Sequence, residues 1–384
     1  MKMRLSLFGF LLCLCSVSPL GAQTTIPNES PSLYKGTRPL GMGNAFVAMP
    51  GIDENAAFYN PAAINDYEKK LHMRILSPAI DFSTGIIGLV KDVKTMADDI
   101  NAKTNSSDKV EVFRSFVNTH TGQVESVNVA LPMAIAMHKY FTFATLMDTR
   151  NTVSLRNRAF TNAEIASRSD AGGLIGTAYN FKDRLGIDEN FQVGLNVKVL
   201  YRFDIEKTIT VADISNTAKF GDIIPFNRGT GVGFDLGLKG DVPTFGYAWL
   251  EALKPTLGLV WQDVGNTRFS GTAPNTTQSI STGFAVHPKF GDWQLHVAND
   301  FRELNQDSGF LQKWNIGAEI MGPRMAGFFT PSVRVGGNQG YIAAGTSLDF
   351  RFAKLEFATY GEEAGQFSTQ KQVRRIASNI SFGF

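Results

Sequence analysis

Several long segments of this sequence alternate between apolar and polar residues. In Phe191–Phe203, FQVGLNVKVLYRF, the odd positions carry Phe, Val, Leu and Tyr, and the even positions carry Gln, Gly, Asn, Lys and Arg, with only Leu200 departing from the rule. A period of two over such a length is that of a β-strand with one apolar and one polar face. The same pattern recurs in Thr230–Leu238 and Ile342–Phe352. The chain is therefore predicted to be all-β.

A soluble β-sandwich also has alternating strands, but three features favour a transmembrane barrel. Many segments run for about ten residues or more, whereas strands of globular proteins usually have about five or six. The polar faces carry Gly, Ser, Asn, Asp, Lys and Arg, which suits a water-filled lumen, and aromatic residues such as Tyr201, Trp261 and Phe350 cluster near strand ends. Apolar bands edged by aromatic residues are typical of outer-membrane barrels. We thus predict a transmembrane antiparallel β-barrel.

Fourteen segments are predicted as strands, an even number, as bacterial single-chain barrels have. With an even number of strands, the first strand begins and the last strand ends on the same side, the periplasmic side, where turns are short. The longer loops then lie on the outside. The outer loops include Ser83–Val124, Arg156–Ser167 and Asp204–Gly229, whereas Gly240–Lys254 is long for a periplasmic turn. The predicted strands are Leu71–Phe82, Glu125–Met137, Tyr140–Ser154, Arg168–Phe181, Phe191–Phe203, Thr230–Lys239, Pro255–Val264, Gln278–Val286, Trp293–Phe301, Lys313–Met321, Phe328–Val335, Tyr341–Phe352, Lys354–Tyr360 and Val373–Phe384.

The last predicted strand ends in phenylalanine. In VRRIASNISFGF, Ile376, Ile380, Phe382 and Phe384 share one face. A final strand with a terminal Phe on the lipid side is the signal commonly used for inserting barrels into bacterial outer membranes. We therefore expect the barrel-assembly machinery as a partner, through the strand ending at Phe384. We also expect outer-membrane lipid as the surroundings and the bacterial cell outer membrane as the location.

The N-terminal residues have the layout of a secretory signal peptide. A basic start is followed by an apolar run at Leu5–Val17 and by a small-residue cleavage site at Ala22. Cys13 and Cys15 lie inside the run, so cleavage would leave a chain without cysteine, which excludes disulfides and Cys-ligated zinc. That chain would be nearly neutral and has no basic patch, which argues against nucleic acid as a partner. No later apolar stretch is long enough for a transmembrane helix.

A dense run of glycine and alanine, Gly36–Ile64, precedes the first predicted strand. Such a run packs closely against other groups but supplies no core of its own, and a barrel of this size has an interior wider than its own side chains fill. We predict a plug, or hatch, inside the barrel, in which glycines let the backbone pass close to the wall and Pro61 after Asn60 fixes a bend. The predicted division is residues 1–22 for the signal peptide, 23–68 for the hatch and 69–384 for the barrel, with Gly41, Gly43, Asn60 and Pro61 as gating residues.

Two of the outer loops show helical periodicity. In Leu89–Ile100 apolar residues recur at helical spacing, with charged residues opposite them. A second helix is predicted to begin at Asp108, with Glu111 completing a capping box, and a shorter one lies around Val211–Ala218. Helices at the outer rim would either gather a hydrophobic molecule from outside or only pack on the rim and close its mouth.

The sequence shows no recognisable catalytic or metal-binding motif. Its five histidines are scattered, and no two have metal-ligand spacing. His296 lies on the polar face of its strand and is predicted to be a solvated lumen residue. The glycine-rich Gly229–Gly233 alternates as a strand and is followed by no helix, so it is not a phosphate loop. We predict no catalytic residue, no metal, no other cofactor and no enzymatic activity.

Short motifs at both ends of the chain resemble those of the FadL-like outer-membrane barrels, the superfamily of long-chain fatty-acid and hydrocarbon transporters. An Asn-Pro-Ala after a small-residue stretch is characteristic of the hatch in that group. The C-terminal third is similar as well, and the likeness covers most of the chain after the signal. The motifs are Gly36–Ala48, Phe58–Ala62, Asn315–Glu319, Arg334–Asn338 with Gly340, and the strand Tyr341–Phe352.

The resemblance implies passive uptake of hydrophobic compounds through a hatch-gated lumen, with release below or sideways through the wall. TraF-like and PorV-like relatives imply a different class of function, a structural or interaction barrel of a transfer or secretion system. The helical insert Asp92–Phe116 resembles the TraF-like branch as much as it resembles the transporters. The lumen lining discriminates between them. A continuous apolar pocket near the hatch favours transport, and a lumen lined only by Asp, Lys, Arg and Asn favours the structural role or a polar pore.

Overall fold

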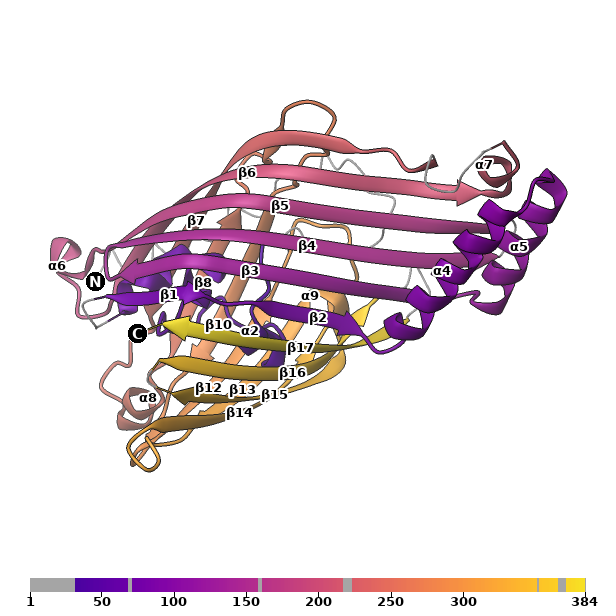
Figure 1. Cartoon of the computed structure of the whole chain (residues 1–384). Helices are drawn as coiled ribbons and strands as arrows, with labels where there is room; N and C mark the ends of the chain where they lie inside the picture. Colours follow the sequence, from indigo (N-terminus) through magenta and orange to yellow (C-terminus); the bar gives the residue numbers. More distant parts are fainter. Residues whose placement is uncertain are drawn as a thin grey trace.

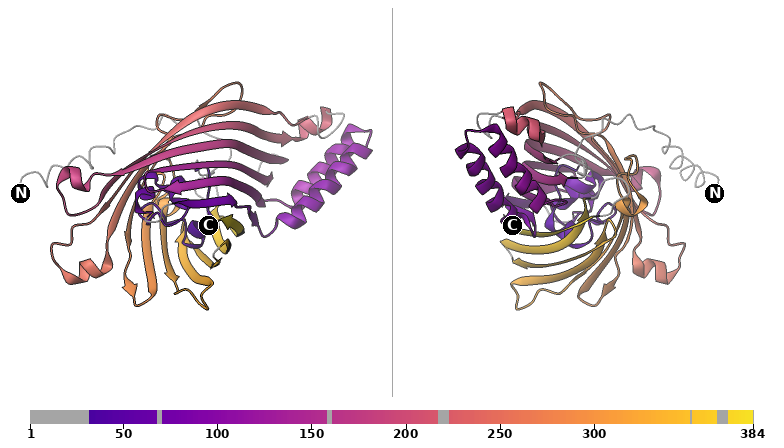
Figure 2. Two further views of the ribbon diagram at one scale, coloured as in Figure 1. Left: turned by 60° about the vertical axis from the view of Figure 1, so that its left-hand side comes forward. Right: turned by 90° about the vertical axis from the view of Figure 1, so that its right-hand side faces the viewer.

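The computed structural model describes residues 32–67, 71–157, 161–216, 223–350, 352–364 and 371–383. Within them the chain forms a closed antiparallel barrel of fourteen spanning strands. Strands adjacent in the sequence pair with one another, and the first, made of β1 (His72–Leu76) and β2 (Ala79–Ser83), closes the barrel against the last, β17 (Gln372–Gly383) (Figures 1 and 2). The predicted barrel is confirmed. The predicted signal peptide and Phe384 lie outside the described residues.

All fourteen predicted strands are found, most of them within a few residues of the predicted bounds. The short β9 (Arg268–Phe269) and β11 (Lys289–Phe290) are added at hairpins. The remaining spanning strands are β3 (Val124–His138), β4 (Phe141–Asn157), β5 (Thr161–Asn180), β6 (Phe191–Thr210), β7 (Asn227–Asp241), β8 (Thr256–Gln262), β10 (Ser279–Val286), β12 (Trp293–Phe301), β13 (Trp314–Met321), β14 (Phe329–Asn338), β15 (Tyr341–Phe350) and β16 (Ala353–Glu363).

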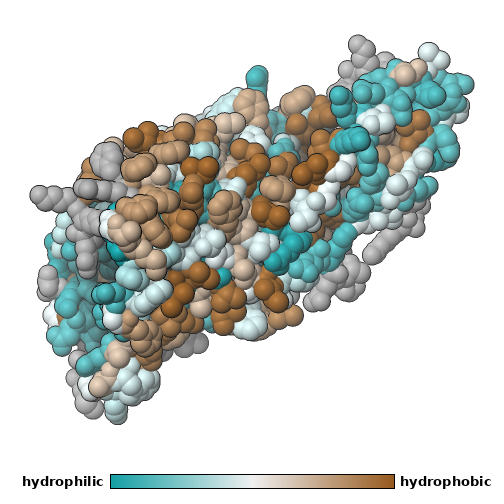
Figure 3. Space-filling view, turned by 60° about the horizontal axis from the view of Figure 1, so that its bottom comes forward, coloured by the Kyte–Doolittle hydropathy of each residue, from teal (hydrophilic) through white to brown (hydrophobic). Residues whose placement is uncertain are grey.

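Strand β6 shows how the period-two pattern is used. From Gln192 to Asp204 its even-numbered side chains, including Lys198 and Arg202, point inward and are buried. Its odd-numbered side chains, such as Val199, Tyr201 and Phe203, face outward and are exposed. Figure 3 shows a hydrophobic band across the barrel between more hydrophilic ends. The outside of the barrel is therefore suited to contact with lipid.

Strands β4, β5 and β6 extend further toward the outer end of the barrel than predicted. The expected loop Arg156–Ser167 is wrong, because β4 continues to Asn157 and β5 begins at Thr161. The loop expected from Asp204 also starts too early, since β6 continues to Thr210. The strands can extend this far because three helices pack on the outward face of the extensions. These helices are α4 (Ile86–Ala102), α5 (Ser106–Thr119) and α7 (Val211–Asn216). The buried cluster between them includes Leu89, Ile100, Phe113 and Ile214 from the helices and Leu155, Ala163 and Ile209 from the strands.

The helices predicted in the outer loops are present. The start of α5 at Ser106 differs from the predicted Asp108, and no side chain caps it, so the capping box with Glu111 is wrong. The extra residues are held where the Ser106 hydroxyl donates to the carbonyl of Ser215, at 2.9 Å. Helices α4 and α5 lie on the outside of the extended strands, to one side of the outer end (Figure 2), so they pack on the rim. Short helices also occupy other connections: α6 (Lys182–Leu185), α8 (Ala248–Leu253) and α9 (Phe310–Lys313).

None of the helices in the described part of the chain is long and apolar enough to cross a membrane.

The first spanning strand is interrupted, which the sequence analysis did not predict. Proline has no N–H to give to a ladder, and β1 and β2 are separated at Ser77 and Pro78. The side-chain amide of Asn379 on β17 donates to the carbonyls of both residues, at 3.2 and 3.1 Å. The wall at this point is thus closed partly by a side chain rather than by a continuous backbone ladder.

Candidate functional site: the lumen plug and its seat

The N-terminal segment from Ser32 to Tyr67 lies inside the barrel (Figures 1 and 2). It forms α2 (Thr37–Gly41), α3 (Asn55–Tyr59) and the 3-10 helix η2 (Pro61–Asp66), joined by turns. Almost all of its side chains are buried, and many of its apolar side chains form one cluster with inward residues of the wall. We call the segment from Ser32 to Tyr67 the plug. The plug members of that cluster are Tyr34, Met42, Ala45, Phe46, Ala48, Met49, Ala56, Ala57, Phe58, Tyr59, Ala63, Ile64 and Tyr67.

Inward-facing glycines of the wall form the seat of the plug. A Cβ on Gly317 would lie 2.1 Å from the carbonyl oxygen of Met42, and one on Gly194 would lie 2.3 Å from the amide nitrogen of Ala62. A Cβ on Gly258 would lie 2.5 Å from the carbonyl oxygen of Val47. Such distances leave no room for a side chain. Gly194 was predicted only as a residue of the polar, lumen-facing side of its strand, and the role of the three glycines in making room for the plug backbone was not predicted.

Two of the predicted gating residues, Gly41 and Gly43, belong to this close contact. A Cβ on Gly41 would lie 3.1 Å from the Cα of Gly345 on β15. Gly43 has a φ of +62°, which favours glycine, and a Cβ there would lie 2.5 Å from the carbonyl oxygens of Gly337 and Ile316. The plug backbone therefore runs against β13, β14 and β15, where glycine faces glycine.

A Gly317→Ala substitution is expected to unseat the plug, because its Cβ meets the backbone oxygen of Met42 and overpacking costs about 1–3 kcal/mol. Hydrogen exchange of the plug amides in the folded protein measures this, and exchange is expected to be faster than in the wild type. Gly173→Ala is the matched control, because its Cβ would meet nothing closer than 3.5 Å. Equal exchange in the two variants would contradict the seat.

The other two predicted residues, Asn60 and Pro61, form a joint inside the plug. Pro61 begins η2, and the side-chain oxygen of Asn60 accepts a hydrogen bond from the amide of Ala62 at 3.1 Å. The side-chain amide of Asn60 donates to the carbonyl of Val47 at 2.9 Å and to that of Leu238 on β7 at 3.1 Å. Asn60 thus connects the plug segment around Val47 with the segment that begins at Pro61, and connects both with β7 of the wall.

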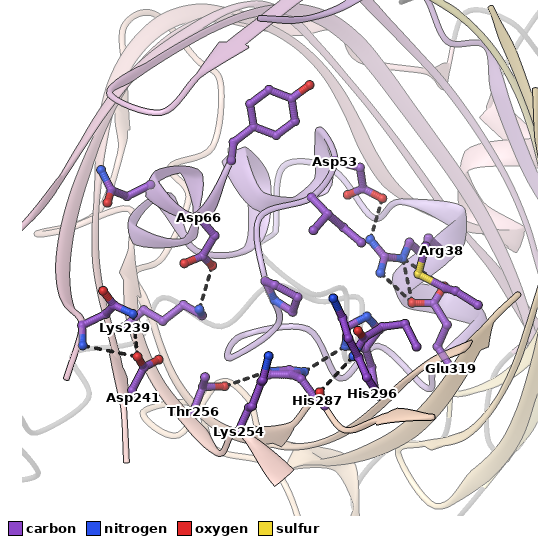
Figure 4. A pocket seen from close by; sticks show the side chains of 18 of the residues that line it. Arg38, Asp53, Asp66, Lys239, Asp241, Lys254, Thr256, His287, His296 and Glu319 are labelled. Atoms are coloured by element: carbon purple, nitrogen blue, oxygen red, sulfur yellow. Dashed lines mark hydrogen bonds and ion pairs between the residues drawn. The ribbon is translucent and has the colours of Figure 1, made fainter. Parts of the chain in front are cut away.

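A buried ionic network joins the plug to the opposite wall. The Arg38 guanidinium lies 2.6 Å from the Glu319 carboxylate on β13 and 2.7 Å from the Asp53 carboxylate (Figure 4). Arg334 on β14 contacts Glu319 at 2.6 Å, and Lys354 on β16 lies 3.4 Å from Asp53. Glu319 and Arg334 are directly paired across the two strands. Opposite charges in bidentate contact are the arrangement that compensates burial of both partners.

Two plug carboxylates are held ionised: Asp53, which belongs to this network, and Glu54, which follows it in the chain. Burial by itself would raise the pKa of Asp53, but Arg38 and Lys354 lower it well below its ordinary value. Burial would likewise raise the pKa of Glu54, but the hydrogen bond from His72 and the charge of Arg74 lower it to about 2. Both contacts therefore attach the plug to the wall through charged groups.

Acid is expected to release the plug. Because folding lowers the pKa of Glu54 from 4.5 to about 2, its contribution is complete above pH 4.5 and is lost as the pH falls toward 2. Asp53 shifts in the same direction. Planar-bilayer conductance should stay low at neutral pH and rise only in that acid range. A rise between pH 7 and 5 would contradict this assignment.

Several wall side chains also bind the plug backbone. The Asp300 carboxylate on β12 accepts hydrogen bonds from the amides of Phe46 and Val47, at 2.6 and 2.8 Å. Side-chain amides and a hydroxyl donate to plug carbonyls along the rest of its path. These donors are Asn196 to Ala57 (2.7 Å), Gln262 to Phe58 (2.8 Å), Asn315 to Gly43 (2.8 Å) and Thr256 to Ala48 (2.9 Å).

A charged cavity of about 1030 Å³ lies below the plug, at the end of the barrel that carries Lys139, Asn190 and Lys289 near its short turns. Figure 4 shows Arg38, Asp66, Lys239, Asp241 and Glu319 around it. Two smaller cavities, of about 30 and 10 Å³, lie between the plug and the wall, and Lys35 and Leu40 line both of them. We name the lower cavity the vestibule. Most of its lining residues are polar or charged, and apolar residues such as Ile52, Val242 and Met321 contribute to the lining as well.

Two histidines meet in the wall of the vestibule. The Nδ1 atoms of His287 and His296 are 2.9 Å apart, and His287 Nε2 lies 3.0 Å from the Thr256 hydroxyl (Figure 4). The prediction that His296 is a solvated lumen residue is wrong, because the His287 ring and the plug above it leave only 3% of His296 exposed. Within the described residues, no group of three or more His, Cys, Asp or Glu side chains could hold a metal ion.

No family model matches the sequence, and no curated protein matches it. Among solved structures, the CymD monoaromatic hydrocarbon channel aligns with a TM-score of 0.50 and 9% identity over 94% of this chain and 98% of CymD. The Pseudomonas putida toluene transporter TodX aligns with a TM-score of 0.50 and 9% identity over 94% of this chain and 99% of TodX. At this level of identity the likeness shows that the chain shares the β-barrel fold of these two proteins.

Proposed function

We propose that the protein is a channel of the bacterial outer membrane for passive uptake of hydrophobic compounds, such as long-chain fatty acids or hydrocarbons, and that the plug is its gate. The observation that supports this most is the alignment of nearly the whole chain with channels for a monoaromatic hydrocarbon and for toluene. Gly41, Gly43, Asn60 and Pro61 are the proposed gating residues, because they connect the plug to the wall and two plug segments to each other.

The charged vestibule indicates where such a solute leaves the barrel. Transfer of an apolar molecule past a lining of ionic groups displaces the water that solvates them, which is costly. A sideways exit avoids the vestibule. The cavity of about 30 Å³ lies between Leu40 of α2 and the wall residues Ala79, Ala130 and Ala377, next to the interruption of the first strand at Pro78. Charged residues line it as well: Lys35, Asp81, Asp148 and Arg150. Its size corresponds to a closed state, and we propose that movement of α2 enlarges it.

The same vestibule favours a second function, that of a TraF-like or PorV-like barrel serving a transfer or secretion system. An open, charged cavity on the periplasmic side is a suitable receptor for a polar partner, and it matches the polar lumen expected for that class. Both functions keep the plug, so they differ in whether a hydrophobic solute crosses the wall.

Uptake of labelled oleate and toluene by a deletion strain tests the proposal. We expect slower uptake without the protein, recovery with the wild-type gene, and no change for a labelled sugar. The purified protein should also bind the labelled compound. No binding together with normal uptake would contradict the channel, and a transfer or secretion defect in that strain would then support the second function.

A further inference from the structure

Helix α4 has one face that nothing in the described structure covers. Its core face, Ile86, Leu89, Met96 and Ile100, is buried. Ile87 and Val90 lie on another face and are 74% and 57% exposed. Lys91 and Lys94 continue this face at the i+4 and i+7 positions and are exposed as well. We call Ile87, Val90, Lys91 and Lys94 the outer-rim face.

The outer-rim face begins where the lipid-facing band ends. Phe82, at the top of β2, pairs with Val127 on β3, and α4 starts four residues after Phe82. The start of α4 lies against β3, since a Cβ on Gly85 would be 2.1 Å from the Glu125 carboxylate. The helix then covers the outward face of the extended strands rather than the lumen. Its exposed apolar residues therefore follow the apolar band in the chain and lie on the outer side of the barrel, as that band does.

The order of residues along this face matches the layers of a membrane surface. The two apolar side chains come first, nearest the band, the two lysines follow, and Asp98 lies one turn further out. Within the described residues, neither Lys91 nor Lys94 forms an ion pair with a carboxylate. Amphipathic helices with apolar residues beside lysines bind at the boundary of acyl chains and anionic headgroups, and lysine stems extend so that the ammonium group reaches the headgroups.

We propose that the outer-rim face of α4 binds a phosphate-bearing lipid of the outer leaflet, of the lipid A type. Ile87 and Val90 contact its acyl chains, and Lys91 and Lys94 pair with its phosphates. This inference rests on the proposed outer-membrane location and on the orientation that places α4 outside. It does not depend on what the lumen transports.

Lipid A binding by the purified full-length barrel, measured by native mass spectrometry, tests this inference. The double variant Lys91→Glu/Lys94→Glu is expected to weaken binding by at least about tenfold, since each lysine near an anionic surface contributes on the order of 1 kcal/mol. Dephosphorylated lipid A should bind the wild type no better than it binds this variant. Ile87→Asn/Val90→Asn should weaken binding of both lipids.

The matched control is Lys254→Glu/Lys289→Glu, which reverses two lysines at the opposite end of the barrel. It is expected to bind lipid A like the wild type. Unchanged binding in Lys91→Glu/Lys94→Glu, equal weakening in the control, or equal binding of the dephosphorylated lipid would each overturn the inference. Normal solute uptake with lost lipid binding would leave the channel proposal standing, whereas lost uptake activity with intact lipid binding would affect that proposal alone.

Discussion

Deletion of Gly36–Ile64 is expected to leave a folded barrel that conducts ions at least about tenfold better than the intact protein. The wall is closed by its own ladder from β1 and β2 to β17, so it does not need the plug for closure. The plug fills the space that the wall glycines leave open, for example at Gly194 and Gly317. Without it, that space and the vestibule below it become one aqueous passage.

Planar-bilayer conductance measures this effect, and heat-modifiable migration in gels shows whether the variant is folded. A folded variant with the conductance of the intact protein would contradict the assignment of Ser32–Tyr67 as the plug.

Arg38→Ala is expected to loosen the plug in an otherwise intact barrel. Removing one partner of a buried ionic pair costs about 3–5 kcal/mol where the other charge is left without any partner, and less where a second partner remains. Here Glu319 keeps Arg334, and Asp53 keeps Lys354, but both lose their bond to the plug helix α2. The expected results are faster hydrogen exchange in residues 36–64 and more frequent conducting events.

Arg202→Ala is the matched control for Arg38→Ala. Arg202 is equally buried and forms a bidentate pair with Asp170, but both residues belong to the wall. It should destabilise the barrel without accelerating exchange in the plug relative to the wall. Equal effects of the two substitutions on the plug would show that Arg38 does not specifically hold the plug against the wall.

Period-two alternation was enough to predict the wall, because each strand needs one face for lipid and one for the lumen. It failed at the outer ends of β4, β5 and β6. There the outward residues Val153 and Ile165 pack against helices that come from other parts of the chain. Whether an outward apolar residue contacts lipid or a helix is decided by tertiary packing, which the alternation of one strand does not contain.

For a similar reason, residues of the plug could be predicted from the sequence, but their partners in the wall could not. The small-residue run led to the prediction of Gly41, Gly43 and Asn60, and the structure places these residues in contact with the wall. Their partners are far away in the sequence, and Arg38 and Glu319 are separated by 281 positions. The motifs around Glu319 and Arg334 were noticed only for their resemblance to the FadL-like barrels. Their pairing across β13 and β14 places both charges against α2.

If the plug is a gate, it must move when a hydrophobic solute passes. Hydrogen exchange of the intact protein, followed by mass spectrometry with and without saturating toluene or oleate, tests this most directly. The amides of Phe46 and Val47, which donate to Asp300 in this structure, are expected to exchange faster when the solute is bound, while the central strands stay protected. Unchanged protection of these amides, with the solute bound and taken up by cells, would contradict a gating plug.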